Sequence, residues 1–223
     1  GYWQVPIKEG DRPKTAFVTA DGVYQFKVMA RGLCSAPGTF QRMMDVVLSG
    51  LRWTTCLVYL DDIVVYSRSL DEHVQGLRGV LGRLRGANLK VKLEKCTFAQ
   101  PQLWALGHIV DKNGVLPDPK QVQAVRDFPH PPVDGSRAVK VKNIRAFLGM
   151  CSYYRRFIDG FAKIARPLHD LVGEKKTFTW GAEAMESFEA LKNALMGAAQ
   201  LAYPDNTKPF EIHPDACEYG IGV

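Results

Sequence analysis

Apolar and polar residues follow two different patterns along the chain. Short apolar runs rich in β-branched and aromatic residues predict strands, at residues 1–7, 14–19, 23–29, 57–60, 63–67, 89–93 and 103–110. Apolar residues at helical spacing predict helices, at residues 36–50, 69–89, 120–128, 143–158, 164–172 and 182–197. The insert at 130–142 contains Pro and Lys and predicts an exposed loop, and strands return after Leu201. This order indicates an α+β region, then a helical region, then the start of a third region with strands.

Several element boundaries have sequence signals of their own. Asp21-Gly22 between two apolar runs is typical of a hairpin turn. Pro37 suits the first turn of the first helix, and Gly50 suits its end. Ser69 and Glu72 form the pattern of a capping box, in which both residues satisfy backbone N–H groups at a helix start. These signals support the predicted hairpin and the first two helices.

The composition places the chain among globular proteins. Of its 223 residues, 46% are hydrophobic and 23% are charged, which argues against disorder. The formal net charge of +6 suits a polyanionic partner, although many proteins with this balance bind no nucleic acid. Five scattered cysteines without a Cys-x-x-Cys pair argue against a disulfide framework or zinc site, and for a reducing compartment. No apolar stretch approaches the roughly 18 residues that span a bilayer, so no membrane partner is expected.

The stretch LVYLDDIVVYS, residues 57–67, sets two adjacent carboxylates between two apolar runs. Neighbouring side chains of a strand point to opposite faces, so we expect Asp61 and Asp62 at a tight turn, with the apolar flanks buried in a core. The plain interpretation is a solvated Asp-Asp turn, because Asp is common in turns. The alternative is a metal site, since a divalent cation relieves the repulsion between neighbouring carboxylates. A two-metal site for nucleotidyl transfer normally needs a further carboxylate from another strand.

An ordered set of motifs resembles the reverse transcriptase region of gypsy-type LTR retrotransposon polyproteins. In the order of that family the motifs are GYWQ, KTAF, GLCSAPGTFQRMMD, YLDDIVVYS, EHV, LGHIV, FLGMCSYYRRFI, IARPL and PFEIHPDA. Each motif is weak alone, but the ordered set is highly specific and extends over essentially the whole chain. The chain begins with GYWQVPI without Met and ends at YGIGV, so we expect a fragment of a longer polyprotein.

The resemblance implies an α+β fold of the right-hand polymerase type. It assigns regions to palm with partial fingers and primer grip, helical thumb, connection and truncated RNase H-like start, at residues 1–118, 119–172, 173–200 and 201–223. The implied activity is RNA- and DNA-directed DNA synthesis at a primer 3′-hydroxyl with two Mg²⁺ ions, for which Mn²⁺ could substitute. The implied partners are an RNA or DNA template–primer and dNTPs. The implied localisation is cytoplasmic, in the virus-like particles of the family.

The resemblance also assigns roles to individual residues. Asp61 and Asp62 correspond to the paired metal-binding palm aspartates, with Asp61 expected as the direct ligand. Lys95 corresponds to a lysine near the incoming nucleotide, where a cation could donate a proton to pyrophosphate; a solvated surface lysine is the alternative. Tyr2 corresponds to the aromatic that excludes a nucleotide 2′-hydroxyl, although it could also be a core residue. Asp215 corresponds to the first RNase H carboxylate, whose site is incomplete in this chain.

Two further groups of residues are expected to contact substrates. Those expected at the nucleotide or template are Lys14, Arg31, Gly32, Ala36, Pro37, Phe40 and Gln41. Phe40 could equally be helix core, and Lys14 a solvated surface residue. Those expected at the primer or its phosphates are Leu106, Gly107, His108, Tyr153, Tyr154, Arg155 and Arg156. Glycine permits close approach of the backbone, and cations suit phosphates, but a structural histidine and a half-buried helix with solvated arginines are the alternatives.

Two departures from the family pattern bear on activity. The family places its leading metal-binding aspartate a few residues before GYWQ, so we expect the chain as given to be inactive. Ala30-Arg31 stand where the family usually has Pro-Phe, and the arginine could bind phosphate or clash. The rival interpretation of the whole chain is a catalytically inactive remnant that only binds nucleic acid. An unrelated metal hydrolase would leave the other motifs unexplained.

Overall fold

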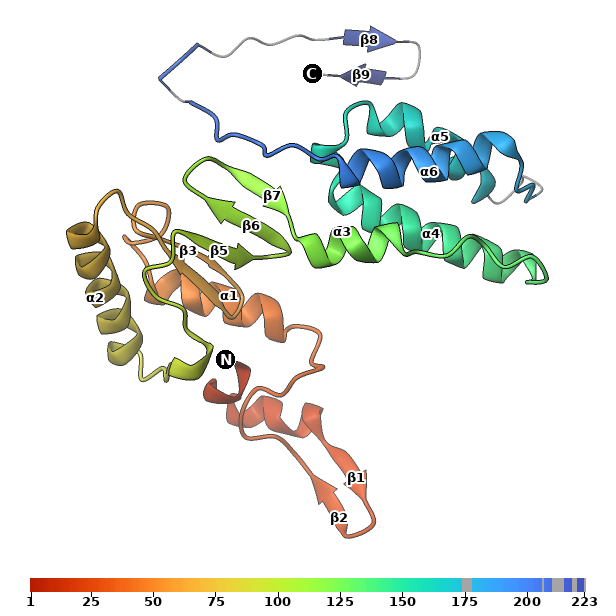
Figure 1. The fold of residues 1–223 in the computed structure, drawn as a ribbon. Coiled ribbons are helices and arrows are strands. Elements are labelled where there is room, and N and C mark those ends of the chain that lie inside the picture. Colours follow the sequence, from red (N-terminus) through yellow and green to blue (C-terminus); the bar gives the residue numbers. More distant parts are fainter. Residues whose placement is uncertain (174–177, 206, 210–214, 218–219, 223) are drawn as a thin grey trace. The chain divides into compact units, whose positions relative to one another are not determined.

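The computed structural model describes residues 1–173, 178–205, 207–209, 215–217 and 220–222. The chain divides into two compact units, residues 1–100 (unit 1) and residues 101–223 (unit 2). Both units combine helices with antiparallel strands (Figure 1). In the described ranges, no helix has both the length and the apolar character needed to cross a membrane.

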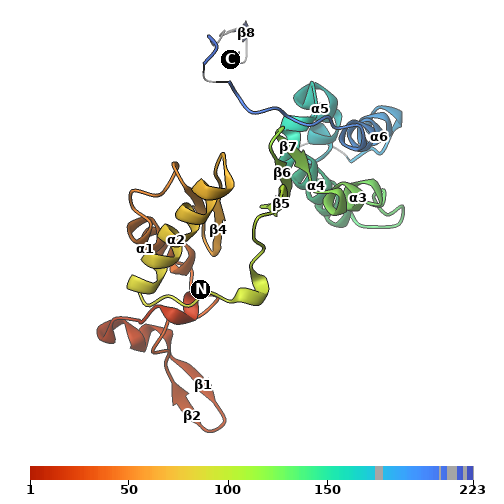
Figure 2. The same cartoon turned by 60° about the vertical axis from the view of Figure 1, so that its left-hand side comes forward.

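Unit 1 contains two hairpins and two long helices. Its elements in chain order are η1 (Tyr2–Gln4), η2 (Glu9–Thr15), β1 (Phe17–Thr19), β2 (Gly22–Tyr24), α1 (Ala36–Val47), β3 (Cys56–Tyr59), β4 (Asp62–Val65), α2 (Leu70–Gly86) and η3 (Leu93–Lys95). Strands β1 and β2 pair antiparallel, as do β3 and β4. The β1–β2 hairpin extends away from α1 and α2 in both views (Figures 1 and 2).

The core of unit 1 lies between one face of the β3–β4 hairpin and the two helices. Across the hairpin Cys56 pairs with Val65 and Val58 with Ile63, and these side chains face the core. The helices contribute the buried residues Phe40, Met44, Leu48, Val80 and Leu84. On the opposite face Tyr59 is 56% exposed. The expectation of a hairpin enclosed in a core therefore holds for one face only, because alternate side chains of a strand point away from the helices.

Unit 2 contains a three-stranded meander followed by four helices. Its elements are β5 (Gln102–Ala105), β6 (His108–Asp111), β7 (Val115–Pro117), α3 (Pro119–Arg126), α4 (Arg137–Tyr153), η4 (Arg155–Phe157), α5 (Phe161–Leu171), α6 (Ala182–Met196), β8 (Asp215–Cys217) and β9 (Gly220–Gly222). The helices share one core, in which the fully buried rings of Phe147 and Phe188 stack with centroids 4.0 Å apart. Aromatic burial of this kind stabilises a helical unit strongly.

The predicted boundary signals act as expected in two places. The Asp21-Gly22 turn connects β1 and β2, whose register pairs Thr19 with Gly22. The Ser69 hydroxyl accepts a hydrogen bond from the Glu72 N–H over 3.3 Å at the start of α2. The Glu72 carboxylate in turn accepts from the N–H of Arg68 over 3.1 Å. The Ser69 half of the capping box therefore forms as predicted, whereas Glu72 accepts from the N–H of Arg68, one residue before the N-cap, rather than from that of Ser69.

Several predictions of local structure were wrong, among them the single strand at 103–110, which is divided between β5 and β6. Residues 1–7 form the short 3-10 helix η1 and a single bridge from Pro6 to Val28, because they find no strand partner of any length in the described part of unit 1. The strand predicted at 89–93 is also absent, and Leu93 begins η3 instead. The exposed loop predicted at 130–142 ends early, because α4 already begins at residue 137. Val141, within the predicted loop, is buried in the structure.

Candidate active site and nucleic-acid interface

The paired aspartates lie at the tip of the β3–β4 hairpin. Tyr59 pairs with Asp62, which leaves Leu60 and Asp61 as a two-residue turn. Leu60 has a φ of 52°, a left-handed conformation. Two-residue hairpin turns commonly need such a residue at the first position, where glycine is preferred. A bulky residue in this region costs on the order of 1–3 kcal/mol and persists only when its surroundings hold it there.

The expected nucleotide-contacting residue Gln41 provides part of that support. Its side-chain oxygen on α1 accepts a hydrogen bond from the Leu60 N–H over 2.6 Å. Its side-chain NH₂ group donates to Asp45 over 2.7 Å and lies 3.4 Å from the Val58 carbonyl. Gln41 therefore contacts the backbone of the turn that carries Asp61.

The first residues of the chain lie against the same turn. The Gly1 amino group is 3.1 Å from Asp61 Oδ1, and the Asp61 side chain is 45% exposed. A Cβ atom at position 1 would lie only 2.3 Å from that oxygen and from the Phe40 ring, so any other residue would have to displace these side chains. The Tyr2 ring meets the Phe40 ring edge-on, with centroids 5.3 Å apart. The structure thus brings together the first two residues of the chain, Phe40 of α1 and Asp61 of the hairpin turn.

The carboxylates of this tip can supply part of a metal ligand set. Asp61 and Asp62 are both exposed, so water and a phosphate-bearing substrate can reach them. Magnesium in proteins is often held by one or two carboxylates, with water and substrate phosphates as the remaining ligands. Within the ranges the structure describes, no three His, Cys, Asp or Glu side chains gather to hold a metal ion. The residues present fit one part of a metal site, and a third carboxylate is not among them.

The other residues expected near the nucleotide lie apart from the hairpin tip or in exposed turns. Lys14 Nζ pairs with Asp11 at 2.6 Å, and this contact lowers the pKa of Asp11 and raises that of Lys14. Arg31 is exposed in the turn before α1, where Gly32 has a φ of 94°. Pro37 lies in the first turn of α1, as predicted. Exposed Lys95 ends η3.

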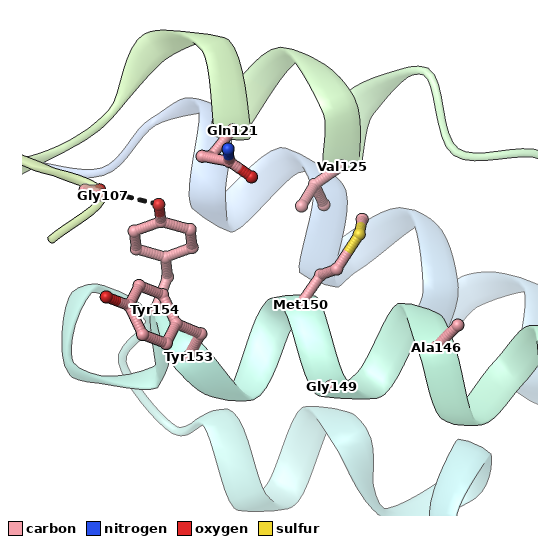
Figure 3. A pocket seen from close by; sticks show the side chains of 8 residues that line it. All are labelled: Gly107, Gln121, Val125, Ala146, Gly149, Met150, Tyr153 and Tyr154. Atoms are coloured by element: carbon pink, nitrogen blue, oxygen red, sulfur yellow. Dashed lines mark hydrogen bonds between the residues drawn. The ribbon is translucent and has the colours of Figure 1, made fainter. Parts of the chain in front are cut away.

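The second group of expected residues lies in unit 2, around the β5–β6 turn. Leu106 and Gly107 form this turn, with φ values of 48° and 70°. Two consecutive left-handed residues are typical of a tight hairpin turn. The carbonyl of Leu106 accepts a hydrogen bond from the Tyr153 hydroxyl. The carbonyl of Gly107 accepts one from the Tyr154 hydroxyl over 2.7 Å, drawn as the dashed line in Figure 3. Two consecutive tyrosines at the end of α4 thus hold two consecutive carbonyls of the turn.

Tyr153 and Tyr154 differ in burial. Tyr154 is 3% exposed, and burial raises the pKa of its phenol to about 12, so the hydroxyl stays a donor at neutral pH. Tyr153 is 54% exposed. The Gly107 Cα approaches them so closely that a Cβ there would lie 3.2 Å from the Tyr154 hydroxyl. The left-handed backbone and the close approach both favour glycine at 107.

Further expected primer-contacting residues surround this turn. The His108 ring packs on the rings of Tyr153, Tyr154 and Phe157, with centroids 5.4–5.8 Å apart. Its Nδ1 lies 2.7 Å from the Leu106 carbonyl. Both arginines of η4, residues 155 and 156, are exposed and available to an anion. Beside the turn is a pocket of about 440 Å³ lined by Gly107, Gln121, Val125, Ala146, Gly149, Met150, Tyr153 and Tyr154 (Figure 3).

The last expected site residue is Asp215. Its backbone begins β8, but its side chain lies outside the described part of the structure. The role expected for it as an RNase H carboxylate stays a prediction.

Two residues near the hairpin tip were not predicted from the sequence. Asp45 binds the Gln41 amide, and Arg52 lies 3.1 Å from the same Asp45 oxygen. The spacing of Gln41 and Asp45, four residues apart on one helix, was the only available signal. Nothing in the sequence indicates that Arg52, beyond the end of α1, returns to this pair.

Comparison with protein families gives two matches. Residues 1–110 match the family described as reverse transcriptase (RNA-dependent DNA polymerase). Residues 180–223 match the RNase H-like domain found in reverse transcriptase, and this match includes α6. The resemblance drawn from the ordered motifs is confirmed.

Similar proteins come from retrotransposons. The retrovirus-related Pol polyprotein from transposon opus of Drosophila melanogaster is 42% identical over 100% of this chain and 23% of its own length. The polyprotein from transposon gypsy of the same organism is 36% identical over 100% of this chain and 22% of its own length. The chain therefore spans less than a quarter of the length of these relatives.

A solved structure shows the same fold. The foamy viral protease-reverse transcriptase in complex with double-stranded DNA matches with a TM-score of 0.81 at 24% identity, over 92% of this chain and 35% of that chain. This likeness confirms the predicted fold class, an α+β polymerase region followed by the start of an RNase H-like region.

Proposed function

Because the chain belongs to the reverse transcriptase family of retrovirus-related Pol polyproteins, we propose that it forms part of an enzyme that extends a primer 3′-hydroxyl by copying RNA or DNA. The observation that carries this proposal is the exposed Asp61-Asp62 tip within the region that matches the family. Two acidic side chains at a hairpin turn, open to solvent, can meet a cation and a triphosphate together. The substrates are a template–primer and dNTPs, and the proposed localisation is cytoplasmic.

Reverse transcriptases generally use divalent metal ions, and Mg²⁺, with Mn²⁺ as a substitute, is our proposal for this chain. Bound metal would favour loss of the proton from the attacking 3′-hydroxyl and would neutralise negative charge on the leaving pyrophosphate. Asp61 and Asp62 would hold it. In the family a further aspartate lies a few residues before GYWQ. The Gly1 amino group lies 3.1 Å from Asp61, so a segment joined to Gly1 would start beside this carboxylate.

Other residues receive substrate-binding roles in this proposal. Tyr2, whose ring meets that of Phe40 edge-on, would contact the nucleotide sugar, and the exposed cations Arg31 and Lys95 would face its phosphates. In unit 2 the turn at residues 106–108 would contact the primer end. The exposed arginines of η4 would contact phosphates, because cations attract the phosphate backbone whatever the nucleotide sequence. Tyr154 is buried and bonded to Gly107, so it would act by supporting the turn.

Primer extension tests the proposal. We would assay this chain, a version extended upstream through the preceding segment of its polyprotein, and the extended version with Asp61→Asn, on poly(rA)·oligo(dT) with Mg²⁺. We expect extension by the longer wild-type form, and a loss on the order of 10²-fold or more in the Asp61→Asn form, because a metal ligand is removed.

The rival function is binding of nucleic acid without catalysis, for which the exposed arginines of η4 would suffice. If the extended form shifts a primer–template in a gel but never extends it, this rival is correct and the polymerase proposal is wrong.

A further inference from the structure

The turn that carries Asp61 is connected to α1 by a short polar chain of residues. It runs from Arg52 through the Asp45 carboxylate and the Gln41 amide to the Leu60 N–H. The three distances are 3.1, 2.7 and 2.6 Å, all within the range of hydrogen bonds. The Arg52 and Asp45 side chains are only 29% and 32% exposed, so water competes weakly for these contacts.

Asp45 fixes the direction of the Gln41 amide. A glutamine amide can point either way, with its oxygen or its NH₂ group toward a given neighbour. An ionised carboxylate only accepts hydrogen bonds, so Asp45 requires the NH₂ group of Gln41 on its side. The amide oxygen is then left facing Leu60, where it accepts from the backbone N–H. Arg52 pairs with the same Asp45 oxygen, at 3.1 Å, and so helps to fix the position of this carboxylate.

The contact falls on the one residue of the turn with a left-handed backbone. Leu60 has a φ of 52°, and its N–H has no partner in the hairpin ladder, where Tyr59 pairs with Asp62. A hydrogen bond from outside the hairpin therefore fixes the turn at its least favourable residue. Asp61 and Asp62 directly follow Leu60, so the backbone conformation of the turn determines where their carboxylates lie.

We propose that Gln41, oriented by Asp45 and Arg52, is a positioning residue that holds the Leu60-Asp61 turn and thereby aims the two carboxylates. This role rests on the proposed polymerase function and differs from the nucleotide contact expected for Gln41 from the sequence. It explains why a helix facing the hairpin carries a glutamine and an aspartate four residues apart. Groups that orient metal ligands typically change activity by about 10- to 100-fold when removed.

The first test needs no catalytic activity. Amide hydrogen exchange at Leu60, measured by NMR on this chain, reports directly on the proposed hydrogen bond. We expect Gln41→Leu to speed exchange at Leu60 by about tenfold, because one hydrogen bond to a turn is lost. Gln75→Leu makes the same change at an exposed position on α2 and serves as the matched control. Unchanged exchange at Leu60 in Gln41→Leu would overturn the proposal.

A swap of the two partners separates orientation from mere packing. Gln41→Glu sets two carboxylates against each other at 2.7 Å and should speed exchange at Leu60 as Gln41→Leu does. Adding Asp45→Asn restores an amide–carboxylate pair with its direction reversed, so the new carboxylate can again accept from Leu60. We expect exchange to return most of the way to the wild-type rate. A double variant as fast as Gln41→Glu alone contradicts the orienting role of Asp45.

Primer extension by the upstream-extended form completes the test. In Gln41→Leu we expect kcat to fall by about 10- to 100-fold with little change in KM for the nucleotide, because positioning rather than binding is lost. A raised KM with unchanged kcat would show that Gln41 contacts the nucleotide, and would contradict the positioning role. If no form extends a primer, the polymerase proposal fails, while exchange at Leu60 still decides whether the polar chain holds the turn.

Discussion

At the scale of single residues, the two tyrosines of the β5–β6 turn allow a matched comparison. Tyr154→Phe removes a buried hydroxyl and its bond to the Gly107 carbonyl. We expect it to lower the free energy of unfolding by about 1 kcal/mol, a typical net value for one hydrogen bond. Tyr153→Phe removes the bond to the Leu106 carbonyl at an exposed position, where water can replace it, so its effect should be smaller. Urea titrations of both variants test this, and equal losses would contradict it.

For single residues, the sequence predicted some features of the site and missed others. The carboxylate tip could be predicted, because adjacent aspartates between apolar runs have few other places to lie. The inward direction of Tyr154 could not, because a run of two tyrosines and two arginines has no period that separates buried from exposed positions. Nor could the contact from Gln41 to Leu60, since it depends on a side-chain direction and a backbone angle across 19 positions.

At the scale of elements, Asp111 connects β6 to the turn that follows it. Its carboxylate accepts from the N–H groups of Asn113 and Gly114 and from the Gln200 side chain, and the Asn113 bond contributes most to lowering its pKa. A carboxyl with a lowered folded-state pKa adds stability above its unfolded value of about 3.9, and loses it as the pH falls through the folded value. Asp111→Asn should therefore flatten the loss of stability of this chain at acid pH.

The control for this prediction is Asp134→Asn, at an exposed aspartate in the loop before α4. Urea titrations between about pH 6 and pH 3 give the unfolding free energy of each form, a range that spans the unfolded-state pKa. If the unfolding free energy of Asp111→Asn falls with pH as steeply as that of wild type and of the control, the Asp111 carboxylate contributes nothing to the acid sensitivity.

Elements with several agreeing signals were predicted well, and those with one signal were not. Helix α2 has helical spacing, a cap and a capping partner, and it lies where predicted. The run at 89–93 has only alternation, and without a pairing partner in the described part of unit 1 it forms no strand. The start of α4 was missed: Val141 lies in its first turns and is buried, and tertiary context of this kind overrides the weak helix propensity of valine.

At the scale of the whole molecule, the two hydrophobic clusters draw their residues from separate units. The cluster of unit 1 lies within residues 2–89, and that of unit 2 within residues 122–198. Phe188 is fully buried in the second cluster and Leu48 in the first. Replacing either by Ala removes a core side chain and leaves a cavity, which typically costs about 2–5 kcal/mol. Because the clusters share no residue, we expect each cost to be confined to one unit.

Hydrogen exchange followed by mass spectrometry can resolve this, since peptides report on each unit separately. Phe188→Ala should speed exchange in α3 to α6 and leave α1, α2 and the β3–β4 hairpin unchanged, and Leu48→Ala should do the reverse. In the double variant the two effects should add within about 0.5 kcal/mol, as for independent sites. Faster exchange in the β3–β4 hairpin on Phe188→Ala would show that the carboxylate tip depends on the helical unit. Confinement would mean that unit 1 holds the geometry of Asp61 and Asp62 by its own contacts, among them the hydrogen bond from Leu60 to Gln41.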